Sequence, residues 1–251
     1  REAFGWNLEQ FLKFGGYPVI SEIYSDNSPG TIARIQSFIR DAIIEPVITR
    51  DIFSLQHVVN TALLKQLLRL VLTLPCEEVS FAKLLGQLSE KGSSATAKHY
   101  LELLEKAFLI KLLYRFTKGK IRQRTSSPKI IPLAPALIHA FSDPTAINNN
   151  PSWYGHVFEA AIISRIAELN FELYYWSNSR EDVDLVIQNN STLCAIEIKS
   201  GKDLDWRGIK AFRKEYPEAK AIMIDRAAGE LLLGAKNPAE VLAALIEQQN
   251  N

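Results

Sequence analysis

Two short apolar runs near the C-terminal end of the chain, residues 183–188 and 193–199, are separated by a brief polar break. Each run has the length and the apolar content of a β-strand. Asn190 and Ser191, at the centre of the break, suit a two-residue turn between antiparallel strands. The pattern predicts a β-hairpin, so the chain must contain a sheet that can bury it.

Charged residues lie at fixed positions in this hairpin. Asp184 and Glu197 are equally far from the turn, so they are expected directly across from each other. Lys199 lies two residues beyond Glu197 and shares its face, because alternate side chains of a strand point the same way. Like charges placed opposite each other destabilise a sheet, so we expect a compensating cation, either Lys199 or a divalent metal.

These residue types indicate phosphodiester hydrolysis. Mg²⁺ is held by one or two carboxylates together with substrate phosphate oxygens, so Asp184 and Glu197 are the candidate ligands of Mg²⁺ or Mn²⁺. Lys199 is the candidate catalytic residue, which orients or deprotonates a water or stabilises the charge that builds on the phosphoryl group. The alternative for these three residues is an exposed, charged strand face.

Glu159 is a fourth candidate and lies in a helix expected at residues 152–169. It belongs to the apolar stripe that Ile162, Ile163 and Ile166 form. A carboxylate on a buried stripe is costly unless it is paired or bound to a metal. We expect Glu159 to complete the catalytic group; the alternative is a helix-edge carboxylate paired with a lysine or an arginine.

The rest of the hydrophobic pattern predicts an α/β (α+β) fold, because helices precede and follow a run of strands. After helices in residues 1–55, we expect helices at residues 63–74, 80–90, 94–108, 152–169, 206–216 and 238–248, and strands at 109–116, 129–133, 171–177, 183–188, 193–199, 220–225 and 230–233. Three helices followed by strand, loop and strand is the order of a winged helix-turn-helix.

Five positive charges without an acid lie at the loop of this expected wing. They are Lys118, Lys120, Arg122, Arg124 and Lys129. Such a local basic patch predicts a contact with the phosphate backbone of nucleic acid, with DNA as the expected partner. The alternative is a winged helix that packs against protein and leaves its loop in solvent.

Several segments together resemble known families. Glu159, Asp184 and Glu197-Ile198-Lys199, in an α-β-β-β-α-β order, look like the PD-(D/E)xK nuclease superfamily. More specifically, the chain resembles the family called domain of unknown function 4143 along nearly its whole length, at Gly15-Gly16-Tyr17-Pro18, Arg50-Asp51, residues 100–110, Gly155-His156-Val157-Phe158-Glu159, Val183-Asp184-Leu185-Val186 and Ile196-Glu197-Ile198-Lys199-Ser200. The resemblance implies that the aspartate and glutamate bind Mg²⁺ and that the lysine is catalytic.

The same resemblance implies a place after a predicted AAA+ ATPase domain. It divides the chain into a helical segment at 1–55 that ends an ATPase lid, a winged-helix-like domain at 56–147 and a nuclease-like domain at 148–251. No G-x-x-x-x-G-K-[ST] sequence occurs, so ATP is expected to bind only through an upstream domain. A second hypothesis is a non-catalytic regulatory module that binds nucleic acid or a partner protein on a nuclease-like scaffold.

The composition of the chain indicates its cellular compartment and excludes some classes of protein. The 29 Lys+Arg against 28 Asp+Glu give a net charge of +1, which excludes a polycation. Cys76 and Cys194 are the only two cysteines and lie in apolar stretches, so neither a disulfide framework nor a zinc site is expected, and we predict a cytoplasmic protein. No apolar run approaches the roughly 18 residues of a membrane span, so no membrane partner is expected.

Overall fold

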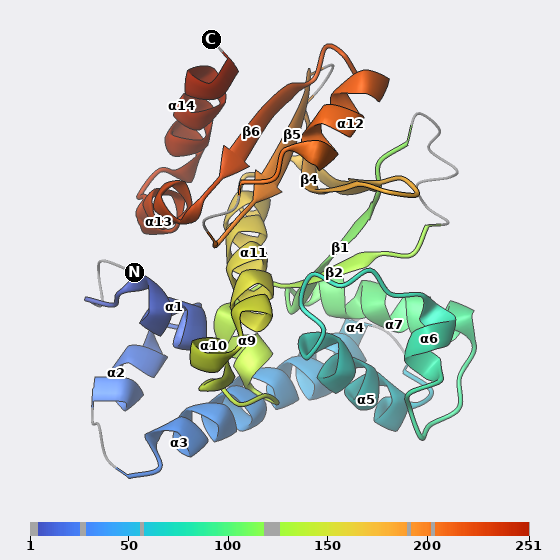
Figure 1. The fold of residues 1–251 in the computed structure, drawn as a ribbon. Coiled ribbons are helices and arrows are strands. Elements are labelled where there is room, and N and C mark those ends of the chain that lie inside the picture. The colour runs from blue at the N-terminus through green and yellow to red at the C-terminus, as the bar shows by residue number, and fades with distance from the viewer. Residues whose placement is uncertain are drawn as a thin grey trace.

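The structure is a computed structural model that describes residues 5–25, 29–55, 58–117, 126–189, 192–201 and 204–250. Strands from both halves of the described chain form a mixed sheet in the order β2-β1-β3-β4-β5-β6 (Figure 1). The strands are β1 (Ile110–Arg115), β2 (Lys129–Pro132), β3 (Glu172–Ser177), β4 (Asp182–Asn189), β5 (Thr192–Ile198) and β6 (Lys220–Ile224). β1 pairs with β3 and β5 with β6 in parallel, and the other neighbours are antiparallel.

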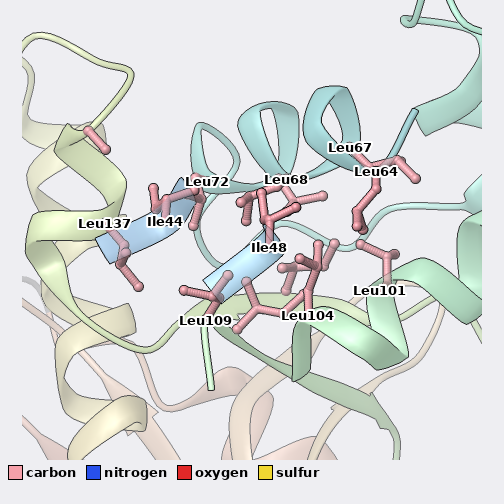
Figure 2. Packing of buried hydrophobic residues seen from close by; sticks show 14 of the residues in the cluster. Ile44, Ile48, Leu64, Leu67, Leu68, Leu72, Leu101, Leu104, Leu109 and Leu137 are labelled. Carbon is pink, nitrogen blue, oxygen red and sulfur yellow. The ribbon is translucent and has the colours of Figure 1, made fainter. Parts of the chain in front are cut away.

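Helices of the N-terminal half share an apolar core that extends to strands β1 and β2 at one edge of the sheet (Figure 1). They are α1 (Leu8–Phe14), α2 (Val19–Ser25), α3 (Thr31–Phe38), the π-helical segments η2 (Ile39–Ile44) and η3 (Val47–Ile52), α4 (Phe53–Leu55), α5 (Thr61–Leu72), α6 (Phe81–Leu85) and α7 (Ser94–Lys106). Figure 2 shows how Ile44 and Ile48 meet leucines of α5 and α7 in this core. Burial of these aliphatic side chains is the main force that holds the helices together.

The C-terminal half surrounds the sheet on both faces. The helices there are α9 (Pro135–His139), α10 (Ala146–Asn149), α11 (Pro151–Ala167), α12 (Arg207–Glu215), α13 (Arg226–Gly234) and α14 (Pro238–Asn250). Side chains of α11, α13 and α14 share a core with one face of the sheet, whereas α12 packs on the other face (Figure 1). Two-sided covering explains why β4 and β5 are buried along most of their length.

The α/β fold class and the hairpin are confirmed. Leu185 pairs with Ile196 and Asn189 with Thr192, which is the register expected for a turn at Asn190 and Ser191. These two turn residues lie outside the described part of the chain. The order α11-β3-β4-β5-α12-β6 also matches the expected α-β-β-β-α-β order.

One expected strand is wrong. Residues 230–233 belong to helix α13, which begins after Asp225, whose side chain accepts a hydrogen bond from the Ala228 backbone amide. Leu232 is buried and Leu231 is 66% exposed. Alanine and leucine favour a helix and the aspartate caps it, so a run of leucines without β-branched neighbours was a poor strand signal.

The two strands expected in the winged region form an antiparallel pair, β1 and β2, after helices α5, α6 and α7. β1 also pairs with β3 through Tyr114 and Arg115, so the pair is continuous with the sheet of the C-terminal half. Lys118, Lys120, Arg122 and Arg124 lie outside the described residues. The division into parts at 1–55, 56–147 and 148–251 stays a prediction, and one sheet crosses its second boundary.

Within the described residues, no helix has the length and the apolar content needed to cross a bilayer.

Candidate active site

A cavity of about 560 Å³ opens where β4 begins and β5 ends, beside helix α11. It is lined by Cys76, Glu78, Lys129, Ser152, Gly155, His156, Glu159, Tyr175, Asp182, Asp184, Ile198, Lys199, Ser200 and Gly201. Its wall contains more charged side chains than a core cavity would tolerate, which is typical of a site for a polar ligand.

Helix α11 supplies one wall. Asn150 caps it by accepting a hydrogen bond from the Trp153 backbone amide, and Pro151 takes the first helical position, where its missing amide costs nothing. Three and four residues separate Ser152, Gly155, His156 and Glu159 along the helix, so all four face the cavity. Glu159 is 9% exposed.

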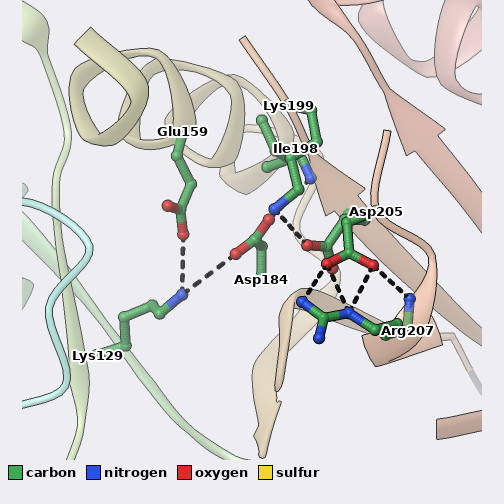
Figure 3. Close-up of polar contacts among 8 residues, drawn as sticks. Lys129, Glu159, Asp184, Ile198, Lys199, Asp205 and Arg207 are labelled. Carbon is green, nitrogen blue, oxygen red and sulfur yellow. Dashed lines mark hydrogen bonds and ion pairs between the residues drawn. The ribbon is translucent and has the colours of Figure 1, made fainter. Parts of the chain in front are cut away.

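Lys129 is the cation that neutralises Glu159. Its Nζ lies 2.9 Å from Glu159 Oε1 and 3.7 Å from Asp184 Oδ1 (Figure 3). Lys129 begins strand β2 and is 8% exposed. We expected it among the surface contacts of the basic loop, and the structure instead places it inside the cluster of carboxylates.

Asp184 lies at the centre of the cluster. Its Oδ2 accepts a hydrogen bond of 2.8 Å from the backbone amide of Ile198, so the end of β5 fixes the carboxylate (Figure 3). Its Oδ1 has Lys129 as an ion-pair partner at a distance beyond a hydrogen bond. This oxygen therefore keeps lone pairs for another cation.

Glu197 and Lys199 form a second ion pair at the end of β5. Lys199 Nζ lies 2.6 Å from Glu197 Oε1. Glu197 Oε2 is buried and has no hydrogen-bond partner among the described residues. A Cβ added to Gly208 of α12 would lie 3.5 Å from this oxygen, so α12 covers Glu197 from behind. Lys199 lines the cavity and Glu197 does not.

The electrostatics of the cluster raise the pKa values of two carboxyls towards neutral pH. Burial, together with the negative charge of Asp184, raises the pKa of Glu159 to about 7 and that of Glu197 to about 8. Burial acts to lower the pKa of Lys199, but its hydrogen bond to Glu197 outweighs burial and the pKa is raised. Lys199 is therefore a charged ammonium, which can stabilise negative charge but cannot take a proton from water.

Two observations bear on whether Mg²⁺ suits these residues. Among the described residues, no group of three or more histidine, cysteine or acidic side chains is arranged to hold a metal. Asp184 and Glu197 nevertheless supply hard oxygen donors, and Glu197 Oε2 is buried with no hydrogen-bond partner in the part of the chain that the structure describes. Mg²⁺ commonly takes one or two carboxylates and completes its shell with water and substrate oxygens, so the two residues fit it.

A family model described as Domain of unknown function (DUF8612) matches residues 5–148. The chain belongs to this family. A second model, Domain of unknown function (DUF4143), matches residues 154–236 of this DUF8612 protein. The resemblance to DUF4143 is thus confirmed for the C-terminal segment. The segments at Gly15–Pro18, at Arg50-Asp51 and at 100–110, which we compared with DUF4143, fall within the DUF8612 match instead.

Uncharacterized protein MJ1544 of Methanocaldococcus jannaschii is 25% identical to the chain over 221 residues. The match covers 85% of the chain and 46% of the relative, so this DUF8612 protein spans about half the length of that relative. No solved structure matches the chain.

Both matched segments contribute to the site. Glu159, Asp184, Glu197 and Lys199 come from the DUF4143 match, and Lys129 comes from the DUF8612 segment. Sequence reasoning brought the first four together and missed the role of Lys129. The available signal was a lysine that opens an otherwise apolar strand, Lys129–Pro132, where a charge needs a partner.

Cys76 lines the cavity but is a poor nucleophile. Burial, and then the charge of Glu159, raises the pKa of the Cys76 thiol well above its ordinary value. The thiolate is the reactive form of cysteine, so the thiol here is inert. The cavity therefore offers carboxylates and ammonium groups for chemistry, and no activated sulfur.

Proposed function

We propose that this chain binds nucleic acid, with DNA as the expected substrate, and hydrolyses its phosphodiester bonds with Mg²⁺ or Mn²⁺. One observation carries the proposal: Glu159, Asp184 and Lys199 line one cavity, with Glu197 paired to the lysine behind it. The order of these residues and their elements is that of PD-(D/E)xK nucleases. A charged strand face exposed to solvent is a poorer account, because Asp184 and Glu197 are each 7% exposed.

Each residue has a distinct role in this proposal. Asp184 and Glu197 hold the divalent ion, which supplies Lewis-acid stabilisation of the phosphoryl group. Lys199 remains protonated beside Glu197 and places its ammonium in the cavity, where it stabilises the negative charge that develops during attack on phosphorus. Glu159 and Lys129 position Asp184 from the opposite side.

The test is cleavage of plasmid and single-stranded DNA by the full chain in Mg²⁺, in Mn²⁺ and in EDTA. We expect cleavage with either ion and none in EDTA. Asp184→Ala and Lys199→Ala should each lower the rate by roughly 100-fold or more, since each removes a group that stabilises the transition state.

Matched controls distinguish loss of a catalytic group from the general effect of removing a charged side chain. Asp41 and Lys210 are exposed and lie outside the cavity lining, so Asp41→Ala and Lys210→Ala should cleave like the unchanged chain. Undiminished cleavage by both cavity variants would sink the mechanism.

A second candidate function is a non-catalytic module on the same scaffold. The observation that favours it is the pairing of Lys129 with two carboxylates, which leaves the cluster close to neutral without a metal. This candidate predicts salt-dependent DNA binding without turnover. Binding should be lost when Lys118, Lys120, Arg122 and Arg124 are neutralised together.

The DUF4143 match also supports a proposal about context. We propose that the chain acts beside an AAA+ ATPase domain of a longer cytoplasmic protein and responds to its ATP cycle. The two free cysteines, both buried, suit a reducing compartment. ATP hydrolysis measured on the full-length protein, with and without DNA, tests this context separately from cleavage.

A further inference from the structure

Lys129 occupies a place in the cluster that nothing in the PD-(D/E)xK pattern assigns. Its ammonium contacts Glu159 at 2.9 Å and Asp184 at 3.7 Å, and only 10% of its side chain is exposed (Figure 3). It reaches the carboxylates from β2, across the junction between the two matched segments. The buried ammonium of Lys129 is therefore a built-in counterion for the Glu159 and Asp184 carboxylates.

A divalent ion at Asp184 would meet this counterion at close range. Glu159, Asp184 and Glu197 provide three carboxyl groups, and Lys129 and Lys199 provide two ammonium groups against them. A metal ion bound to Asp184 and the ammonium of Lys129, which lies 3.7 Å from Asp184 Oδ1, are both positive. They repel each other strongly where water and salt do not screen them. Occupation of Asp184 by a metal therefore opposes its ion pair with Lys129.

We infer that Lys129 competes with the divalent ion for Asp184 and thereby sets the metal affinity of the site. The inference rests on the proposed role of Asp184 and Glu197 as ligands. Metal loads weakly while Lys129 lies between Glu159 and Asp184. An added anion, such as a substrate phosphate, strengthens loading because it offsets the charge of the lysine.

Mn²⁺ alone is the probe, and its binding to the full chain is measured by electron paramagnetic resonance. The informative variant is the double change Lys129→Met with Glu159→Gln. It removes the lysine and avoids leaving Glu159 buried without a partner, which would destabilise the fold. We expect the double variant to bind Mn²⁺ roughly tenfold or more tightly than the unchanged chain.

Glu159→Gln alone is the matched control. It retains Lys129, whose nearest remaining carboxylate is then Asp184, so Mn²⁺ affinity should not rise. Addition of Asp184→Asn to the double variant should abolish the gain, which assigns the bound ion to Asp184. The melting temperature of the double variant should rise with Mn²⁺ more than that of the unchanged chain.

Two outcomes overturn the inference, and they differ in what they say of the proposed function. Equal, measurable Mn²⁺ affinity of the unchanged chain and the double variant would overturn the competition and leave the metal ligands in place. Binding of Mn²⁺ to neither protein, while both remain folded by circular dichroism, would overturn the metal role of Asp184 and Glu197 and the competition with it.

Discussion

Asp184 lies between two lysine–glutamate ion pairs that differ in how much solvent reaches the ammonium group. In the pair of Lys129 and Glu159 the side chains are 10% and 12% exposed, whereas Lys199 is 32% exposed beside a Glu197 that is 9% exposed. A buried pair cannot lose one partner cheaply, while a half-open lysine can exchange its partner for water or substrate. The pair of Lys129 and Glu159 is therefore suited to stabilising the fold, and the pair of Lys199 and Glu197 is suited to catalysis.

The two pairs also differ in what they join. Lys129 and Glu159 belong to β2 and α11, so their contact ties the DUF8612 segment to the DUF4143 match. Glu197 and Lys199 are two residues apart at the end of one strand. The substrate-facing pair is therefore local, and the supporting pair depends on the whole fold.

The largest expected effect comes from breaking the buried pair. Lys129→Met leaves Glu159 and Asp184 without their cation and should lower the free energy of unfolding by about 3–5 kcal/mol, measured by urea denaturation. Lys111→Met is the control, because Lys111 pairs with Glu105 at 3.0 Å but is 37% exposed. It should cost at most about 1 kcal/mol. Equal losses would contradict the contrast between buried and open pairs.

The second effect concerns the support behind Glu197. A Cβ on Gly208 would lie 1.8 Å from the Asp182 carbonyl oxygen, so Gly208→Ala must push α12 away from β4. We expect a loss of about 1–3 kcal/mol in urea denaturation, as in other overpacked contacts. Gly201→Ala is the control because a Cβ there meets nothing within 4 Å. A stable Gly208→Ala would mean that α12 does not support this pair.

The local pair was easier to predict than the long-range pair, for a physical reason. The register that places Asp184 across from Glu197 follows from a short turn, and alternation along one strand places Lys199. Glu159 was found because a carboxylate on an apolar helix stripe needs a partner. The partner itself, Lys129, is thirty residues away, and its neighbours in the sequence suggested a basic surface loop.

The sheet shows the same division between local and distant information. Strands β3, β4 and β5 were visible as separate apolar runs. The parallel pairing of β1 with β3 joins residues that are sixty apart, such as Tyr114 and Tyr174, and no periodicity encodes such a pairing. The error at α13 was local, because periodicity alone does not distinguish a strand from a helix in a run of only three leucines.

A third prediction compares the two glutamates by pH. Their carboxyl pKa values are raised to about 7 for Glu159 and about 8 for Glu197, above the ordinary 4.5. The folded chain therefore holds more protons than the unfolded chain, and this contribution to stability is full below about pH 4.5 and is lost as the pH rises to about 8. The free energy of unfolding should fall over that range.

Glutamine substitutions assign this pH dependence to its groups. Glu159→Gln and Glu197→Gln should each make the fall in the free energy of unfolding with rising pH smaller, by an amount on the order of 1 kcal/mol. In Glu159→Gln the remaining decline should extend to the higher pH, since Glu197 has the higher pKa. Urea denaturation at intervals between pH 5 and pH 9 measures it. A decline that survives both substitutions together would assign the pH dependence to other groups.

The smallest expected effect is that of Lys199→Met on stability. Although Lys199 Nζ lies 2.6 Å from Glu197, its loss should change the free energy of unfolding at pH 7 by less than about 1 kcal/mol. The pKa of Glu197 is about 8 even though Lys199 acts to lower it, so loss of the ammonium raises this pKa further and Glu197 keeps its proton at pH 7 rather than becoming an unpaired buried charge. The cost should grow at pH 9, where keeping this proton is less favourable. A cost at pH 7 as large as that of Lys129→Met would show that both pairs hold the fold, and the contrast around Asp184 would fail.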